Sequence, residues 1–364
     1  MRVVISAGGT GGHIYPAVAI INKIKEHEPK SEFLYIGTTN RMEKDIIPEM
    51  GIRYEGIEIV GIQRKLLWKN FGVLRKFFAA RRKCLELIKD FDPDIVIGVG
   101  GYVTAPVIWA AHKLGKKTFI HEQNSVVGLS NKYLSRFVDR VGVSFESTIN
   151  CFPRGKATYT GNPCSEKAIG MLPIDKKKYG LSNDKKLVLI VMGSLGSTSV
   201  NNKLLSCLDK FDNKDYEVVF VTGKGNYEKI SKKKVSSNVK IVPYIDDMPA
   251  LMKVTDLMIT RAGASTISEI TALGVPSIFI PSPYVPNNHQ YKNAMDLVNK
   301  DAALILEESR LDGNTLISLI DNAFSDEKYI KDMRSKLKKI GVRDSGERIY
   351  KILKDLIKND KRFF

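Results

Sequence analysis

Several features that assign a chain quickly to a class are scarce here. Only four cysteines occur in 364 residues, and none forms a C-x-x-C pair, which argues against both a disulfide framework and a zinc site. No apolar run reaches the roughly 18 residues that a membrane-spanning helix needs. The N-terminus reads as a strand instead of a basic stretch followed by an apolar one. We therefore expect a protein of a reducing compartment that is neither secreted nor held by a spanning helix.

Two familiar nucleotide signatures are also missing from the most informative motif. Residues 7–13 read Ala-Gly-Gly-Thr-Gly-Gly-His, after an apolar strand and before an apolar helical stretch. A G-x-G-x-x-G fingerprint counted from Gly9 needs a glycine where Ile14 stands, and the Gly-Lys-Ser/Thr ending of a P-loop is absent. NAD and ATP are therefore poor candidate ligands.

What this loop does have is typical of an anion site. Its four glycines allow a close approach of the backbone to a ligand, and the helix that follows offers N–H groups to a diphosphate. His13 adds a side chain that titrates near neutral pH and can accept a proton. The alternative is a tight turn with a surface histidine.

Charge and length limit the class further. The chain has 57 Lys and Arg against 40 Asp and Glu, a formal charge of +17, which favours nucleic acid, a phosphorylated substrate or an acidic lipid surface as partner. Charge alone does not choose among these. The length exceeds what one core usually serves, and 43% apolar residues supply material for two.

The same pattern of buried strands and amphipathic helices occurs twice. Continuous apolar strands of this kind are typical of parallel sheets covered on both faces. They are expected at residues 3–6, 33–36, 94–99, 117–120 and 140–143, and again at 187–192, 217–221, 239–242, 256–260 and 276–280. The expected fold class is α/β, with two doubly wound domains facing each other across a ligand cleft. We place them at residues 1–161 and 162–344. A last helix, in residues 345–364, either finishes the second domain or packs back on the first.

At this point the motifs resemble those of a known family. Gly-Gly-Thr-Gly-Gly-His (8–13), Gly-Gly-Tyr (100–102), His-Glu-Gln-Asn (121–124), Gly-Asn-Pro (161–163), Arg-Ala-Gly-Ala-Ser-Thr-Ile-Ser-Glu (261–269) and His-Gln-Tyr (289–291) occur in the order seen in the MurG family, within glycosyltransferase family 28. The resemblance covers essentially the whole chain.

The resemblance implies a GT-B fold and an inverting, metal-independent transfer. N-acetylglucosamine moves from UDP-N-acetylglucosamine to the 4-hydroxyl of undecaprenyl-diphospho-N-acetylmuramoyl-pentapeptide (lipid I), which gives lipid II for peptidoglycan synthesis. It implies no cofactor, a peripheral position on the cytoplasmic face of the bacterial membrane, an anionic lipid surface as partner, and possible contacts with other cell-wall proteins. Such a displacement needs a base, stabilisation of the leaving diphosphate and exclusion of water.

The resemblance also assigns roles to residues. His13 is the candidate base, with binding of the diphosphate or acceptor as its alternative role, and Glu122 either orients His13 or takes the proton itself. His121 is expected to be a packed side chain. The candidate substrate-binding residues are Thr10, Gly11, Gly12 and Asn124 in the first half and Ser194, Ile245, Ala264, Ser265, Thr266, Glu269 and Gln290 in the second. Among them, Ala264 to Thr266 offer N–H groups to the UDP diphosphate, Glu269 accepts the ribose hydroxyls, Ile245 contacts uracil through its backbone, and Gln290 contacts sugar hydroxyls.

Two departures from the family pattern and one false lead need notice. Leu195 replaces a glutamine usual in the second glycine loop, and Cys164-Ser165 follow Gly-Asn-Pro where an arginine is common. Asp92-Pro93-Asp94 has the D-x-D form of metal-dependent glycosyltransferases, but it precedes a strand and therefore lies at the edge opposite the expected cleft. We interpret it as a turn and expect no metal site.

A basic and aromatic segment, residues 64–83, is the candidate membrane contact. Phe71, Leu74 and Phe78 share one helix face, and Trp68 extends it through a loop. Such a face can enter a lipid interface while cations bind anionic headgroups. The alternative is a core helix with solvated charges.

Two competing functions remain. A related UDP-sugar:diacylglycerol glycosyltransferase would share the fold and the association with a membrane. A non-catalytic nucleic-acid-binding protein would explain the charge, but no nucleic-acid module is visible, so no nucleic-acid partner is expected.

Overall fold

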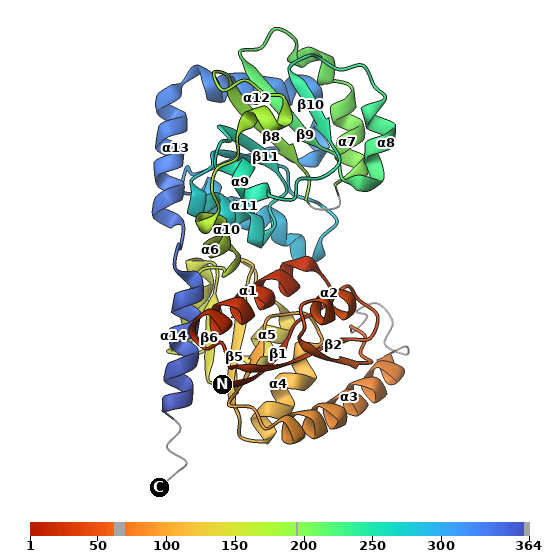
Figure 1. The fold of residues 1–364 in the computed structure, drawn as a ribbon, viewed down its shortest axis with the longest axis vertical. Helices are drawn as coiled ribbons and strands as arrows, with labels where there is room; N and C mark the ends of the chain where they lie inside the picture. Colours follow the sequence, from red (N-terminus) through yellow and green to blue (C-terminus); the bar gives the residue numbers. More distant parts are fainter. Residues whose placement is uncertain (62–69, 194–195, 360–364) are drawn as a thin grey trace. The chain divides into compact units, whose positions relative to one another are not determined.

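The computed structural model describes residues 1–61, 70–193 and 196–359 (Figure 1). The chain forms two compact units, Met1–Cys164 with Asp344–Phe364, and Ser165–Arg343. Each unit has its own parallel sheet and its own apolar core. The predicted fold class, α/β with two doubly wound halves, is confirmed. Among the described residues no helix is both long enough and apolar enough to cross a bilayer.

The sheet of the first unit has its topological switch point beside its central strand. Its described strands follow the order β3-β2-β1-β4-β5-β6-β7, and their pairings are parallel. The chain leaves β1 in one direction for β2 and returns on the other side at β4, so the loops after β1 and β4 are the favoured place for a ligand. The strands are β1 (Arg2–Ser6), β2 (Glu32–Thr38), β3 (Arg53–Ile57), β4 (Ile95–Gly98), β5 (Lys117–Glu122), β6 (Arg140–Val143) and β7 (Ala157–Tyr159).

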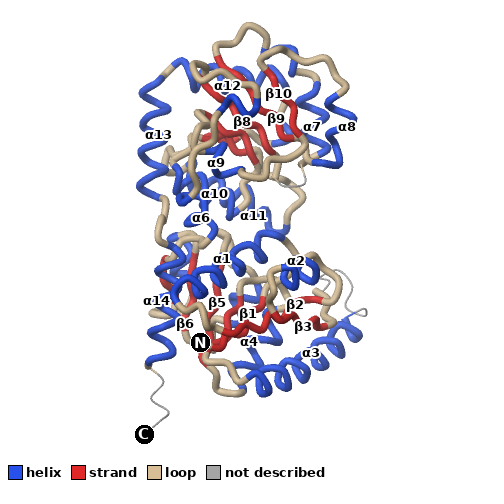
Figure 2. Tube along the Cα trace, in the orientation of Figure 1, coloured by secondary structure: helices blue, strands red, loops and turns tan. Residues whose placement is uncertain are grey.

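Helices cover both faces of this sheet (Figure 2). Strand side chains alternate between two clusters, so that Val3 and Ile5 pack towards α1 and α14 while Val4 packs towards α3 and α4. The helices are α1 (Gly11–His27), α2 (Glu43–Glu49), α3 (Asn70–Phe91), α4 (Thr104–Lys113), α5 (Leu129–Leu134) and α14 (Ser345–Lys358), with the 3-10 helix η2 (Glu146–Cys151).

The packing of the last helix, which the sequence left open, is decided by polar and aromatic contacts. α14 lies against α1, where the ring of Tyr350 stacks on His27 with centroids 4.1 Å apart. Glu28, at the end of α1, accepts hydrogen bonds from Tyr350 (2.9 Å), Lys354 (2.5 Å) and the N-terminal ammonium group (3.1 Å). α14 therefore belongs to the first unit.

The second unit repeats the scheme. Its described strands follow the order β10-β9-β8-β11-β12-β13 with parallel pairings, so its switch point lies between β8 and β11. Its strands are β8 (Lys186–Val191), β9 (Tyr216–Val221), β10 (Val239–Val242), β11 (Leu257–Thr260), β12 (Ser277–Phe279) and β13 (Leu304–Ile305). Its helices are α7 (Thr198–Leu205), α8 (Lys224–Ser231), α9 (Met248–Met252), α10 (Ala264–Leu273), α11 (His289–Val298), α12 (Gly313–Ser325) and α13 (Glu327–Ile340), and α6 (Cys164–Gly170) joins the two units. Short 3-10 helices are η3 (Lys176–Tyr179), η4 (Leu208–Phe211), η5 (Pro286–Asn288) and η6 (Glu308–Arg310).

The expected strands are all present to within a residue or two, and three further strands were not expected. β3, β7 and β13 lie at the edges of their sheets. None of them gives a continuous apolar run, because they are short or carry polar side chains on a half-covered face.

Candidate active site

The first glycine loop lies at the carboxyl end of β1, where α1 begins. Thr10 is extended at the start of the helix, Gly9 has φ +94°, and the N–H groups of the first turn point along the helix axis away from its body. Thr10 and Gly12 are exposed, whereas Gly11 and His13 are half-buried. The loop therefore presents backbone donors and an imidazole at one place, the arrangement that a diphosphate or another anion needs.

The first glycine loop is held by the buried carboxylate of Glu43, which the sequence analysis did not predict. Glu43, at the start of α2, accepts hydrogen bonds from the N–H of Gly9 (3.3 Å) and from the N–H (3.1 Å) and hydroxyl (2.7 Å) of Thr38. It is fully buried. The N–H of Gly9 is thus directed to the protein itself, which leaves anion binding to the helix start. Nothing in the spacing around Glu43 signals this role.

The Gly100-Gly101 turn packs against the same loop. Both glycines have positive φ, +106° and +86°. A Cβ on Gly100 would lie 2.4 Å from Nδ1 of His13, and one on Gly101 would lie 2.5 Å from the carbonyl oxygen of Gly8. The turn is therefore the surface on which the His13 ring rests.

His13 is hydrogen-bonded to Gln123, the residue after the one expected to orient it. Nδ1 of His13 lies 3.0 Å from Oε1 of Gln123. The carboxylate of Glu122 instead accepts hydrogen bonds from the N–H groups of Asn124 (3.1 Å) and Gly128 (2.9 Å) and from Asn131 (2.9 Å). Neighbouring residues at the end of a strand point to opposite faces, so Glu122 and Gln123 cannot share one partner. Glu122 thus organises the loop that carries Asn124.

His121 is a packed side chain, as predicted. It is fully buried, and desolvation lowers its pKa to about 4, although its hydrogen bond to the carbonyl of Gly161 acts the other way. His121 is therefore neutral at physiological pH.

In the second unit, the motif of residues 261–269 lies where the sequence places it, at the end of β11 and the start of α10. Gly263 is the extended residue before the helix, and Ala264, Ser265 and Thr266 form its first turn. Oγ of Ser265 is buried without a hydrogen-bond partner among the described residues, which suits a group that receives a ligand. Glu269 follows one turn later, and desolvation raises its pKa to about 7 against an opposing effect of Lys167.

Arg261 links this motif to the second glycine loop by a hydrogen bond, and a buried ion pair with Glu308 holds Arg261 in place. Arg261 donates to the carbonyl of Ile280 (3.0 Å) and to Oγ of Ser197 (2.9 Å), and its Nη2 lies 2.6 Å from Oε2 of Glu308. Gly196 in this loop has a φ of +74°, a backbone conformation that favours glycine, and a Cβ there would lie 2.1 Å from the carbonyl oxygen of Thr222. Arg261 thus fixes the loop by its end. Ser194, the predicted donor contact in this loop, and Leu195 lie outside the described residues.

Two further predicted residues are positioned by local contacts. Oε1 of Gln290 accepts the N–H of Ser282 at 2.9 Å, which ties α11 to the loop after β12. Ile245 is buried and lies in the loop shortly after β10.

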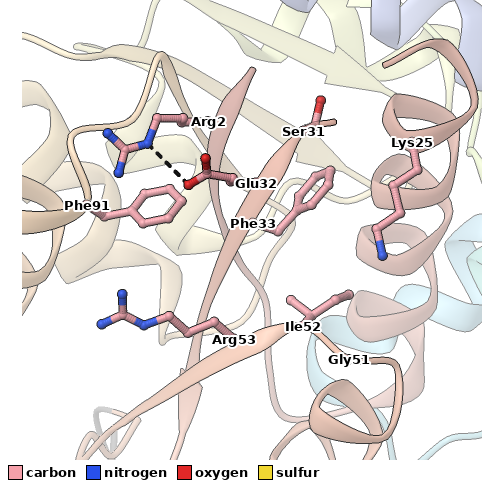
Figure 3. Close-up of a pocket in the computed structure, with 9 residues that line it drawn as sticks. All are labelled: Arg2, Lys25, Ser31, Glu32, Phe33, Gly51, Ile52, Arg53 and Phe91. Atoms are coloured by element: carbon pink, nitrogen blue, oxygen red, sulfur yellow. Dashed lines mark ion pairs between the residues drawn. The ribbon is translucent and has the colours of Figure 1, made fainter. Parts of the chain in front are cut away.

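A cavity of about 400 Å³ lies at the other end of the first sheet (Figure 3). Arg2, Glu32 and Arg53 at strand starts line it, together with Phe91 at the end of α3. Arg2 lies 3.6 Å from Glu32 and over the ring of Phe91. Ligands of doubly wound sheets bind at the carboxyl ends of the strands, so we do not assign the site here. Asp92 and Asp94 belong to this edge too, where they bind Lys116 and the N–H of Arg2.

Comparison with known proteins places the chain among glycosyltransferases. Residues 3–143 match the glycosyltransferase family 28 N-terminal domain, and residues 187–349 match the family 28 C-terminal domain. A protein of Bacillus licheniformis is 44% identical over 98% of this chain and 99% of its own length, and one of Bacillus cereus is 45% identical over 98% and 100%. Both are named UDP-N-acetylglucosamine--N-acetylmuramyl-(pentapeptide) pyrophosphoryl-undecaprenol N-acetylglucosamine transferase, the second with the number 1. The crystal structure of Acinetobacter baumannii MurG superimposes with a TM-score of 0.79 at 26% identity, covering 97% of this chain and 99% of that one.

Proposed function

Because the chain belongs to glycosyltransferase family 28, we propose that it transfers N-acetylglucosamine from UDP-N-acetylglucosamine to N-acetylmuramyl-(pentapeptide) pyrophosphoryl-undecaprenol, that is, lipid I. The protein is a hexosyltransferase with a GT-B fold, and its product is lipid II of peptidoglycan synthesis. The observation that carries this conclusion is the 44–45% identity, over nearly full length, to relatives named for this reaction. A diacylglycerol acceptor is not favoured.

The first unit supplies the proposed base for this inverting reaction. His13 accepts the proton of the acceptor 4-hydroxyl while that oxygen attacks the anomeric carbon of the donor sugar. Thr10, Gly11 and Gly12 offer donors for the diphosphate oxygens of a bound substrate. Glu122 acts on the acceptor side through the loop that it holds, which carries Asn124.

The second unit supplies the proposed donor site. The first turn of α10 and the hydroxyl of Ser265 stabilise the diphosphate as negative charge grows on the leaving UDP. Glu269 accepts the ribose hydroxyls. Ser194, the backbone of Ile245 and Gln290 complete the donor contacts.

The lipid substrate requires that the enzyme reach a membrane, and α3 carries the proposed contact. Phe78 is 60% exposed, and the Arg81 guanidinium lies 3.1 Å from the centre of the Trp109 ring. Leu129 and Tyr133 on α5 are 63% and 55% exposed. These five residues, which we call the α3–α5 patch, join apolar area to positive charge, a combination that favours an anionic interface. The later part of α3 packs on the sheet through Cys84 and Ile88.

The sequence predicts this contact at Trp68, Phe71, Leu74 and Phe78, and of these Phe78 belongs to the α3–α5 patch. Trp68 lies outside the described residues, and so do the side chains of Phe71 and Leu74. The protein acts, in this proposal, as a peripheral enzyme on the cytoplasmic face, where the nucleotide sugar is available and where other cell-wall proteins are its partners.

A direct assay tests the proposal. The purified protein is incubated with labelled UDP-N-acetylglucosamine and either lipid I or diacylglycerol, with and without EDTA. We expect label in a β-1,4-linked product with lipid I alone, and equal rates in EDTA. Transfer to diacylglycerol but not to lipid I would reject the assignment, and a loss in EDTA that metal restores would reject the metal-independent mechanism.

A further inference from the structure

Gln123 links the two buried or half-buried histidines of the first unit. Its Oε1 lies 3.0 Å from Nδ1 of His13, and its Nε2 lies 3.1 Å from Nδ1 of His121. Nε2 of Gln123 also donates to the carbonyl of Val99 at 2.9 Å. Nε2 of His121 lies 3.0 Å from the carbonyl oxygen of Gly161. The chemistry of the groups in this hydrogen-bond network, from the carbonyl of Gly161 to His13, sets which atom donates in each hydrogen bond.

The carbonyl oxygen of Gly161 can only accept a hydrogen bond. Nε2 of His121 must therefore carry the hydrogen that binds Gly161. His121 is neutral because burial lowers its pKa to about 4. Its Nδ1 is therefore an acceptor, and it takes a hydrogen from the amide nitrogen of Gln123.

The amide of Gln123 has no second orientation of equal quality. A flip would turn its oxygen towards the carbonyl of Val99 and the lone pair of His121, so both hydrogen bonds would be lost. Oε1 consequently faces His13. Only an N–H can complete that contact, which places the proton of neutral His13 on Nδ1 and its lone pair on Nε2.

We propose that Gln123 is a positioning residue for the transfer reaction, because its amide holds His13 as the Nδ1–H tautomer with Nε2 as the proton-accepting atom. The inference rests on the proposed function and on His13 as its base. In the reaction, the acceptor hydroxyl loses its proton to Nε2 of His13, its oxygen forms the bond to the anomeric carbon, and the bond from that carbon to UDP breaks with its electron pair leaving on UDP. The imidazolium keeps its Nδ1–H bond to Oε1 and later releases the Nε2 proton to water.

A double-mutant cycle separates positioning from general support of the fold. We expect Gln123→Leu to lower kcat about tenfold or more with the donor KM within about twofold, and to have no further effect in the His13→Ala background. Asn131→Leu is the matched control. It removes another buried amide, bonded to Glu122 and to the carbonyl of His121 but not to His13, so its effect should be the same factor in both backgrounds. An equal loss from Gln123→Leu with and without His13 would overturn the proposal.

Nitrogen NMR of protein labelled with ¹⁵N-histidine tests the tautomer without any substrate. The chain has five histidines, so single substitutions assign every signal. We expect His13 protonated at Nδ1 and His121 protonated at Nε2 in the wild type, and loss of the Nδ1–H preference of His13 in Gln123→Leu. His13 protonated at Nε2 in the wild type would overturn the inference whether or not the enzyme transfers sugar. Failure of the wild type to use lipid I would instead reject the proposed function.

Discussion

A side-chain carbon on Gly100 would lie 2.4 Å from Nδ1 of His13, so the glycine and the imidazole fill one space between them. We expect Gly100→Ala to lower kcat by roughly tenfold to a hundredfold, because a displacement of the base by about 1 Å is enough for such a loss. Steady-state kinetics with lipid I measures it, and the donor KM should change little.

Gly155→Ala is the control for backbone strain. Gly155 also has a positive φ, +78°, but a Cβ there would meet no described atom within 4 Å. Backbone strain should cost each variant about 1–2 kcal/mol of stability. The contact with the His13 ring adds to this loss in Gly100→Ala, and only that variant should lose turnover. Equal losses of kcat in the two variants would show that backbone strain, and not displacement of the His13 ring, lowers the rate.

Glu269 should make donor binding depend on pH near neutrality. Burial raises its pKa to about 7, and the carboxylate is the form that accepts two ribose hydroxyls. We therefore expect the donor KM to rise as the pH falls from 8 to 6. In Glu269→Gln the KM should be about tenfold higher and flat over this range. A wild-type KM that does not change with pH would contradict the ribose role.

Glu269 should also affect the stability of the fold, but there the protonated form is the favourable one. Its folded pKa of about 7 exceeds the ordinary value of 4.5, so the folded state binds more protons between these limits. Its contribution to the free energy of unfolding is present below pH 4.5 and is lost as the pH rises through 7. Glu269→Gln should lack this decline in thermal unfolding measured from pH 5 to 8 without ligand.

The Arg261–Glu308 pair should be costly to break from one side. Both side chains are about nine-tenths buried, and their charged atoms lie 2.6 Å apart. We expect Arg261→Met to lower the free energy of unfolding by about 3 kcal/mol, and Arg261→Met with Glu308→Leu to recover most of it. The single variant should also raise the donor KM, since Ser197 loses its anchor.

An exposed pair in the same unit gives the comparison. Lys331 and Glu327 lie 3.5 Å apart and are 76% and 69% exposed. Lys331→Met should change stability by less than about 0.5 kcal/mol in denaturant unfolding. If Arg261→Met changed stability no more than this, the buried pair would not hold the loop.

Glu28 should make the docking of α14 sensitive to acid. Desolvation opposes its charged form, but hydrogen bonds from Lys354, the N-terminus and Tyr350 outweigh it and lower the pKa to about 2. This stabilisation is present above pH 4.5 and is lost as the pH falls towards 2. Glu28→Gln should be about 1–2 kcal/mol less stable at pH 7, with a difference that shrinks below pH 4. A difference independent of pH would point to lost packing instead.

The membrane proposal predicts a selective loss of lipid binding. Replacing Trp68, Phe71 and Leu74 by Ser, or Phe78 and Arg81 by Ser, should reduce sedimentation with anionic vesicles severalfold. Turnover of a water-soluble acceptor should stay intact. Leu172→Ser, at a site 84% exposed in the second unit, is the control and should bind vesicles like the wild type. Undiminished binding in both multiple variants would place the contact elsewhere.

Local patterns were enough for the fold class and for the location of the motifs. The apolar runs at residues 3–6 and 187–192 predict buried parallel strands, and the glycines that follow each run predict a tight loop. The positions of the loops at the carboxyl ends of β1 and β8 therefore follow from the sequence. The same is true of α10, whose start after a strand and a glycine is a local signal.

The partners of the side chains were beyond local reasoning. Gln123 rather than Glu122 binds His13, Glu43 braces Gly9, and Arg261 pairs with Glu308, across separations of 110, 34 and 47 positions. Such pairings depend on which loops the strand order brings together and on the face each side chain takes, neither of which appears in sequence spacing. The sequence by itself determined the strands, the glycine turns and the helix starts, because these depend on neighbouring residues. Only the tertiary structure decided which groups orient the base and where the last helix packs, because hydrogen bonding and burial are settled between distant segments.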